Sequence, residues 1–438
     1  MDPDRAPLTP AGHPDSPDSP DSPDSPDSPS PGANRSIADS LGIGRGETAA
    51  DGTPRWNRLP GTPIGALVVP VVVLLGVFYL WPLVTLLTRV VRGHTIADTL
   101  RVPGLGAVLW FTLWQAVIST IVTLVVAMVP AYVLARYRFT GRRTVMAIVT
   151  VPFMLPTVVV GAAFLALLPA SWQGTARAVI VAHVFFNVAV VVRIVGGMWS
   201  VIAHDLTGAA RTLGASPWQV ARHVVLPLLR PAIWAAGLVV FLFTFTSFGV
   251  VTLLGGPSHP TIEVEIARRA TQLGDVGGAA VLSMLQLGVL GVLVVVSTRQ
   301  QRRAALALGG VAAPRRPRSA GERSLVGVTV AAVVVAMGVP LLAMIRRSLY
   351  IGGGWSLEAW RALGGGTSRR GIQLGVDAWA SLFASLRFAV VAAGLSAVAG
   401  GLAALAITSA RRGGRLLDAG TMLPLGTSAV TIGFGMLI

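Results

Sequence analysis

The sequence contains no cysteine and no lysine, and charged residues of any kind are scarce. Without cysteine, the chain has no disulfide, no thiolate metal site and no thiol nucleophile. Without lysine, it lacks the cation of a G-x-x-x-x-G-K-[ST] phosphate-binding loop, so any nucleotide hydrolysis must take place on another chain. Only 12% of the residues are charged, whereas a soluble protein has about 25%.

Long apolar segments make up most of the remaining sequence. Hydrophobic residues amount to 53%, and several runs reach the ~20 residues that a helix needs to cross a bilayer. A transmembrane β-barrel would show segments of about ten alternating residues instead. The sequence therefore predicts an all-α polytopic membrane protein. The expected spans are 64–88, 107–135, 144–168, 178–200, 231–254, 279–298, 325–345, 379–408 and about 417–438.

The first 58 residues differ from the rest of the chain. They are polar and rich in proline, and residues 15–29 are five copies of Asp-Ser-Pro. Such a segment has too little apolar surface to fold, so 1–58 is predicted to be a disordered tail. It lacks the charged-then-apolar layout of a signal peptide.

Arginine is concentrated in alternate loops. Loops 136–143, 201–230, 299–324 and 411–415 carry 17 arginines, whereas the longer loops on the opposite side carry 11. The denser side is cytoplasmic by the positive-inside rule, and the N-terminus lies on the same side. The basic charge is thus assigned to membrane topology, and no nucleic-acid partner is expected.

The sequence also contains a weak internal repeat. Residues 110–166 align without gaps on 382–438, at an offset of 272 and with the same expected direction across the membrane. This is the pattern of a parallel repeat. The expected organisation is a first six-span half at 59–300, a basic cytoplasmic linker at 301–324, and the start of a second half at 325–438. The second half is expected to be cut short; a naturally short variant is the alternative.

The most informative loop is 205–231, between two spans. Apolar and small residues at Leu206, Ala209, Ala210 and Leu213 lie on one face of a helix. Gly214 then suits a left-handed helix end. The run Ser216-Pro217-Trp218-Gln219 is a capping-box pattern that starts a second helix. Pro227 and Pro231 are expected to break this second helix before the next span. An ordinary linker and a docking element both fit this pattern.

The same loop resembles the EAA loop of the permeases of type I ABC importers. The family pattern is Glu-Ala-Ala, a glycine four residues after the second alanine, and Ile-x-Leu-Pro ten residues after that glycine. This chain has Gly208-Ala209-Ala210, then Gly214, then 224–227 as Val-Val-Leu-Pro. Gly208 stands in place of the glutamate and Val224 in place of the isoleucine. The missing glutamate puts in doubt any polar contact that it makes.

The resemblance implies a function and a set of partners. The flanking segments 183–187, 243–249, 254–256 and 261–266 are similar to the fused two-half permeases of thiamine and ferric-iron importers. Such a permease binds a pair of ABC ATP-binding subunits, which use ATP and Mg, and receives its solute from an extracytoplasmic binding protein. It lies in the bacterial plasma membrane and binds no cofactor or metal itself. Thiamine and ferric iron are the expected solutes, ahead of phosphonates and polyamines. The residues expected to couple to the ATPase are Gly208, Ala209, Ala210, Leu213, Gly214, Ser216, Val224, Leu226 and Pro227.

Polar residues within the spans are candidates for the translocation path, because unpaired polar groups are costly in lipid. They are Asn187, Thr244, Thr246, Ser247 and Arg387. Hydroxyl groups can equally bond to their own helix or join neighbouring helices. His183 has no second metal ligand at suitable spacing, so an interfacial or a packed histidine is expected instead of a metal ligand. Glu263 and Glu265 alternate with apolar residues, which predicts a short extended segment on the outer side.

Other function classes fit the sequence less well. A secondary transporter with its own ion coupling favours acidic groups within the spans, and the eight complete expected spans contain none. A membrane-embedded enzyme would show clustered residues such as H-E-x-x-H, whereas the six histidines are scattered. A scaffold without transport leaves the coupling-loop pattern unexplained.

Overall fold

A computed structural model describes residues 64–93, 101–202, 204–304, 314–363, 377–409, 420–421 and 429–437. These residues belong to one compact unit, Thr62–Ile438. The predicted disordered tail 1–58 and the loop 411–415 lie outside the described residues.

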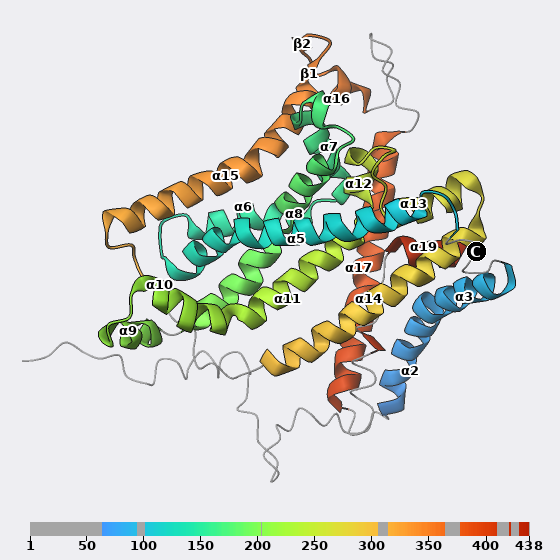
Figure 1. Ribbon diagram of the computed structural model, residues 1–438. Helices are drawn as coiled ribbons and strands as arrows, with labels where there is room; N and C mark the ends of the chain where they lie inside the picture. Colours follow the sequence, from blue (N-terminus) through green and yellow to red (C-terminus); the bar gives the residue numbers. More distant parts are fainter. Residues whose placement is uncertain are drawn as a thin grey trace, which may run out of the picture. The chain divides into compact units, whose positions relative to one another are not determined.

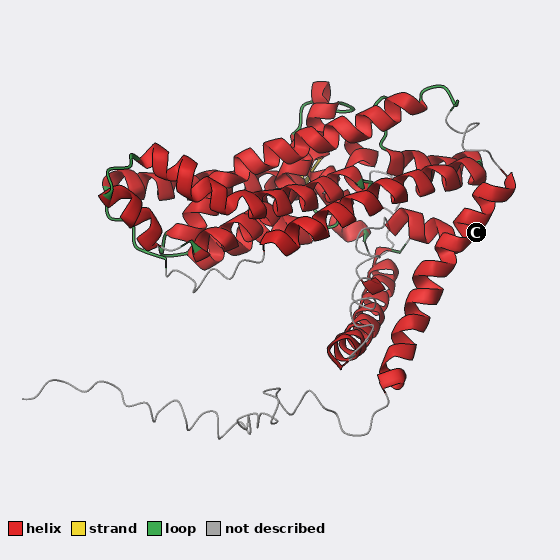
Figure 2. Ribbon diagram, turned by 60° about the horizontal axis from the view of Figure 1, so that its bottom comes forward, coloured by secondary structure: helices red, strands yellow, loops and turns green. Residues whose placement is uncertain are grey.

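Helices dominate the part of the chain that the structure describes (Figures 1 and 2). Seven helical segments are long and apolar enough to cross a membrane, and an eighth if the bent pair α6–α7 counts as one span. The prediction of an all-α polytopic membrane protein is confirmed. The elements are α2 (Ile64–Leu75), η2 (Gly76–Leu80), α3 (Trp81–Gly93), α5 (Leu105–Arg136), α6 (Arg142–Met154), α7 (Thr157–Leu167), η3 (Ala170–Trp172), α8 (Ala176–Val201), α9 (His204–Thr212), α10 (Pro217–Val220), η4 (Ala221–Val225), α11 (Leu226–Phe245), α12 (Gly249–Leu254), α13 (Ile262–Arg268), η5 (Arg269–Leu273), α14 (Val276–Ala304), α15 (Ala320–Leu349), β1 (Tyr350–Ile351), β2 (Gly354–Trp355), α16 (Glu358–Ala362), α17 (Ala378–Ser409) and α19 (Ala429–Leu437).

The span expected at 144–168 is bent. Helices α6 and α7 meet at an angle of 102°. Leu155 precedes Pro156 and is extended, with ψ of 144°, because the proline ring disfavours a helical conformation in the residue before it. The expected span at 144–168 is therefore two helices joined by a sharp bend.

The span expected at 231–254 is also divided differently. One continuous helical segment runs from Pro217 to Phe245 through α10, the π-helical turn η4 and α11, and α12 follows as a separate short helix. Pro227 lies in the first turn of α11, directly after η4. The wider π-helical turn of η4 rearranges the backbone hydrogen bonds that a proline would otherwise interrupt. The predicted proline break is therefore wrong, and the second helix of loop 205–231 is the start of a span.

Helices α5, α8 and α11 pack against one another and form the main core (Figure 1). Small residues permit close approach of helices in a membrane, and a methyl group on Gly196 would lie 3.3 Å from the carbonyl oxygen of Ala131. The fully buried alanines of this core are Ala127, Ala131, Ala178, Ala182, Ala189 and Ala236. They give the three helices a rigid common centre.

The helix bounds agree with the internal repeat. Helix α7 begins at Thr157 and α19 begins at Ala429, 272 residues later. Helices α5 and α17 are each 32 residues long. The α19 segment packs against α3, where the Thr85 hydroxyl donates to the carbonyl oxygen of Gly435 at 2.9 Å. The division of the chain into halves at 59–300 and 325–438 stays a prediction.

Candidate coupling loop and buried polar core

Loop 205–231 forms the predicted helix-turn-helix. Helix α9 ends at Thr212, and Gly214 follows it with a φ of +86°, in the left-handed region. The Gly214 N–H donates to the carbonyl of Arg211 at 3.0 Å, and the Ala215 N–H donates to the carbonyl of Ala210 at 3.1 Å. These two bonds are the Schellman motif, which satisfies the last carbonyl groups of a helix.

The second helix starts with the predicted capping box. The Gln219 N–H donates to the Ser216 hydroxyl at 3.3 Å, and the Ser216 N–H donates to the Gln219 side-chain oxygen at 2.8 Å. Pro217 occupies the first turn, where its missing N–H has no helical partner to lose. Both ends of the turn are therefore fixed by local bonds.

The loop presents large apolar side chains to its surroundings. Leu213 is 88% exposed and Trp218 is 70% exposed, while Gly208, Ala209 and Pro227 are also exposed. Leu226 is 43% exposed, and Ala210 and Val224 are half-buried. Next to this surface lies a groove of about 830 Å³, with Trp199, Trp218 and Pro227 among its lining residues. Exposed apolar surface of this kind is typical of an interaction site.

Trp218 was missed as a site residue, because the sequence analysis considered it only as part of the capping-box run 216–219. The sequence did contain a signal for it: the capping box uses the side chains of Ser216 and Gln219, so capping does not account for a tryptophan between them. A side-chain bond also holds the loop to the core: the Arg136 guanidinium, at the end of α5, donates to the Thr207 hydroxyl at 3.3 Å. This bond ties α9 to the end of α5, a helix of the main core.

The candidate path residues on α8 and α11 lie in the interior of the bundle. Asn187 and Thr244 are buried, and the Thr244 hydroxyl donates to its own helix, to the Val240 carbonyl at 2.9 Å. Thr246 likewise donates to the Leu242 carbonyl at 2.8 Å. Their part in a translocation path stays a prediction.

Ser247 and His183 form the centre of a buried polar layer. The His183 Nε2 atom and the Ser247 hydroxyl share a hydrogen bond of 2.8 Å, and His183 Nδ1 lies 3.4 Å from the Ser119 hydroxyl. Gln115, one turn before Ser119 on α5, donates to the Thr244 carbonyl at 2.9 Å. The packed histidine is confirmed. Gln115 and Ser119 were missed, because only the folded bundle brings them to residues more than 60 positions away.

Arg387 lies apart from this layer. It is on α17, where its side chain is exposed and its guanidinium carbon lies 5.9 Å from the centre of the Phe388 ring. The structure therefore does not bring it together with the other four candidates.

The segment around Glu263 and Glu265 is a helix, α13, and not the extended segment predicted. Both carboxylates are buried. Glu265 binds Arg269 at 2.8 Å, and Arg269 binds Asp275 at 2.7 Å. Burial alone would raise the pKa of the Glu265 carboxyl, but hydrogen bonds from Arg268 and Arg269 outweigh it and hold the pKa below its usual range. The alternation of charged and apolar residues was misleading, because an ion network satisfies the charges inside the fold.

Glu263 is fully buried against the span α14. The Gln286 side-chain amide donates to its carboxylate at 2.7 Å. This pair joins α13 to the middle of α14 and extends the polar interior toward the end of the bundle that is predicted to face outward.

Comparisons with known proteins place this architecture in a family. Residues 123–303, from the middle of α5 to the end of α14, match the profile of the binding-protein-dependent transport system inner membrane component. The chain is 30% identical over 220 residues to the sulfate transport system permease protein CysT of Escherichia coli, covering 46% of this chain and 78% of that protein. It is 29% identical over 209 residues to the thiamine transport system permease protein ThiP of Salmonella typhimurium, covering 44% of this chain and 39% of that protein.

The match to the thiamine permease therefore covers less than half of that protein's length, and the match to the sulfate permease covers most of it. The matched segment contains α8, α11, loop 205–231, and His183 and Ser247 of the buried polar layer. The chain belongs to the family of binding-protein-dependent transport system inner membrane components, the permeases of type I ABC importers.

Proposed function

We propose that the chain forms the translocation path of an ATP-driven importer and that a pair of separate ATP-binding subunits docks on loop 205–231. The observation that carries the proposal is the capped helix-turn-helix, which holds Leu213 and Trp218 exposed on a rigid support. ATP and Mg are used by the partner subunits, and this chain binds neither. Gly208 in place of the motif glutamate leaves the apolar face unchanged.

The structure supplies two mechanical links from the loop to the spans. The first is the continuous helical segment Pro217–Phe245, through which a displacement at Trp218 reaches α11. The second is the hydrogen bond from Arg136 to Thr207, which links α9 to α5. Closure of the ATP-binding subunits would pull on both links, and the two halves of the permease would rock about a central path.

The proposed setting is the bacterial plasma membrane with a cytoplasmic N-terminus. An extracytoplasmic solute-binding protein delivers the solute to the opposite side. The solute is a small molecule or ion: thiamine and ferric iron follow from the sequence resemblance, and the relatives named for sulfate add an oxyanion. Membership of the permease family favours this proposal over a secondary transporter or a scaffold.

Reconstituted transport tests the proposal. The full chain is placed in proteoliposomes with the ATP-binding subunits and the binding protein that co-purify with it, and uptake of labelled thiamine, ferric iron and sulfate is measured. Uptake of one solute that requires both ATP and the binding protein is expected. Uptake that needs neither and follows a proton or sodium gradient would contradict the proposal. The residues that line the solute pocket of the binding protein then identify the solute class.

A further inference from the structure

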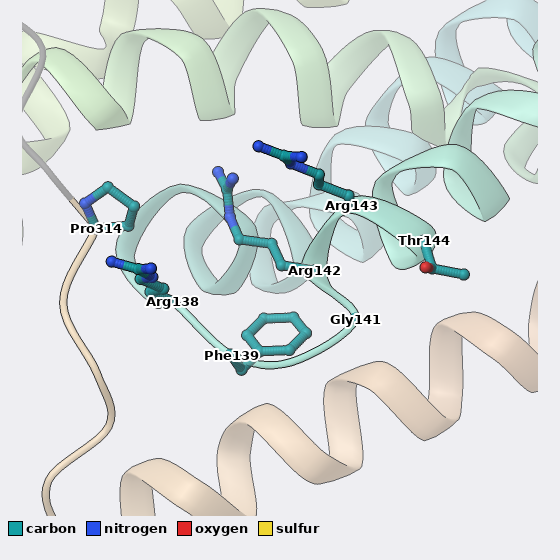
Figure 3. A pocket seen from close by; sticks show the side chains of 7 residues that line it. All are labelled: Arg138, Phe139, Gly141, Arg142, Arg143, Thr144 and Pro314. Atoms are coloured by element: carbon teal, nitrogen blue, oxygen red, sulfur yellow. The ribbon is translucent and has the colours of Figure 1, made fainter.

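An arginine-rich hollow lies where the loop after α5 meets the start of α6 and the segment before α15 (Figure 3). It has a volume of about 580 Å³ and is lined by Arg138, Phe139, Gly141, Arg142, Arg143, Thr144 and Pro314. In Figure 3 the Arg142 and Arg143 side chains extend to the same side of the loop, and Arg138 lies next to Pro314. The loop residues thus gather three guanidinium groups around one hollow.

These three arginines have no acidic partner within the described residues. Arg142 donates from Nε to the Leu134 carbonyl at 2.7 Å, which fixes its side chain at the end of α5. The one nearby acid in the described segments 136–144 and 314–323 is Glu322, and its carboxylate is already bound by Arg315.

Apolar side chains continue from the hollow along the membrane-spanning surface. Phe139 packs against the core together with Val330 of α15. On the same helix, Leu325 and Val328 are 37% and 65% exposed. A ligand that fits both surfaces has an anionic phosphate at one end and acyl chains at the other. A soluble oxyanion would use only the charged part.

We propose that this hollow binds the phosphate of an anionic phospholipid, with the acyl chains lying along the exposed face of α15. The predicted orientation puts the hollow at the cytoplasmic ends of the spans, where anionic lipids attract basic residues. Guanidinium groups match the planar, multi-oxygen geometry of a phosphate. This assignment does not depend on the proposed transport function.

Lipid titration of the full chain in detergent, followed by native mass spectrometry, tests the site. Phosphatidylglycerol is expected to bind more tightly than phosphatidylcholine. Replacing Arg138→Gln and Arg143→Gln together should weaken the first phosphatidylglycerol binding about 30-fold, since each basic residue near the surface contributes about 1 kcal/mol. Phosphatidylcholine binding should not change.

The matched control is Arg316→Gln with Arg318→Gln, which removes the same charge from the same end of the fold without touching the hollow. It should change phosphatidylglycerol affinity by less than about twofold, because neither side chain lines the site. Equal weakening by both double variants would show general electrostatic attraction and overturn the proposal.

Two further outcomes are decisive. Inorganic phosphate that displaces phosphatidylglycerol at similar concentration would assign the hollow to a soluble oxyanion and overturn the lipid proposal. Should the Arg138/Arg143 double variant fail to fold, the two single variants decide, each with an expected loss of about fivefold.

Discussion

Gly214→Ala tests whether the turn in loop 205–231 must have its observed shape. Gly214 has a φ of +86°, and a Cβ there would meet no atom within 4 Å among the described residues. The substitution therefore changes the backbone preference and nothing else. Gly208 is the matched control, because it lies in helix α9 and its Cβ would also meet open space.

The expected magnitude follows from backbone conformation. An L-residue in the left-handed region costs roughly 1–2 kcal/mol, so the equilibrium constant for forming the turn falls about 5- to 30-fold. Gly208→Ala has the opposite sign, since alanine favours a helix over glycine by about 1 kcal/mol. Gly214→Asn should lose less than Gly214→Ala, because asparagine tolerates the left-handed conformation.

The assay is the affinity of the full chain for its co-purifying ATP-binding subunit. Gly214→Ala should raise the dissociation constant by about 5 to 30-fold, while Gly208→Ala should leave it unchanged or lower it. The melting temperature of the membrane core should stay the same in both variants, because the turn lies outside the core. Equal affinities for Gly214→Ala and the unchanged chain would refute the reasoning, as would an equal loss in Gly208→Ala.

Three other predictions concern stability and topology. The Glu265 carboxyl has a pKa below the ordinary value of 4.5, so its ion pairs contribute stability that is full above pH 4.5 and is lost as the pH falls through the lowered pKa. The melting temperature should drop in that pH window, and Glu265→Gln should remove this drop. Parallel curves of melting temperature against pH for the variant and the unchanged chain would show that other groups cause the drop. His183→Leu leaves the buried Ser247 hydroxyl without its 2.8 Å partner and should lower the free energy of unfolding by about 1–3 kcal/mol, measured by denaturation in detergent; a change near zero would contradict the role of the polar layer. Leu213→Cys and Leu357→Cys each introduce a single cysteine at an exposed position. An impermeant maleimide should label Leu213→Cys from the cytoplasmic side and Leu357→Cys from the opposite side. Labelling of both from one side would overturn the predicted topology.

Local features of the fold were predictable from the sequence. Hydropathy places the long spans because a helix must be apolar along its whole length to cross a bilayer. The Gly214 turn and the Ser216 capping box depend on neighbouring residues only, so their sequence patterns are sufficient. The family resemblance likewise depended on the spacing within this one loop.

Features that depend on distant residues were not predictable in the same way. Pro227 does not break its helix because a π-helical turn precedes it, and no local pattern announces that turn. The bend before α7, by contrast, has a local cause, because Pro156 disfavours a helical conformation at Leu155, so the sequence already contained its signal. Glu265 was expected near the surface, and it is buried because Arg269 and Asp275 complete its ion network.

The continuity of helix between loop and span changes the mechanical interpretation. A linker separated from the span by a proline break would transmit force through a flexible joint. The observed segment Pro217–Phe245 has no such joint within it, and the Arg136–Thr207 bond adds a second attachment to α5. Loop 205–231 is thus built as an extension of the bundle.

The most direct test of the account uses the absence of natural cysteine in the chain. A benzophenone maleimide attached at Ala209→Cys or Leu213→Cys is the only photo-cross-linker present, and Thr140→Cys, exposed in the neighbouring loop 136–143, is the control. Irradiation of the assembled complex should cross-link Ala209→Cys and Leu213→Cys to the ATP-binding subunit, and Thr140→Cys should give no cross-link. No cross-link from either loop position, or equal cross-linking from Thr140→Cys, would contradict the assignment of loop 205–231 as the coupling site.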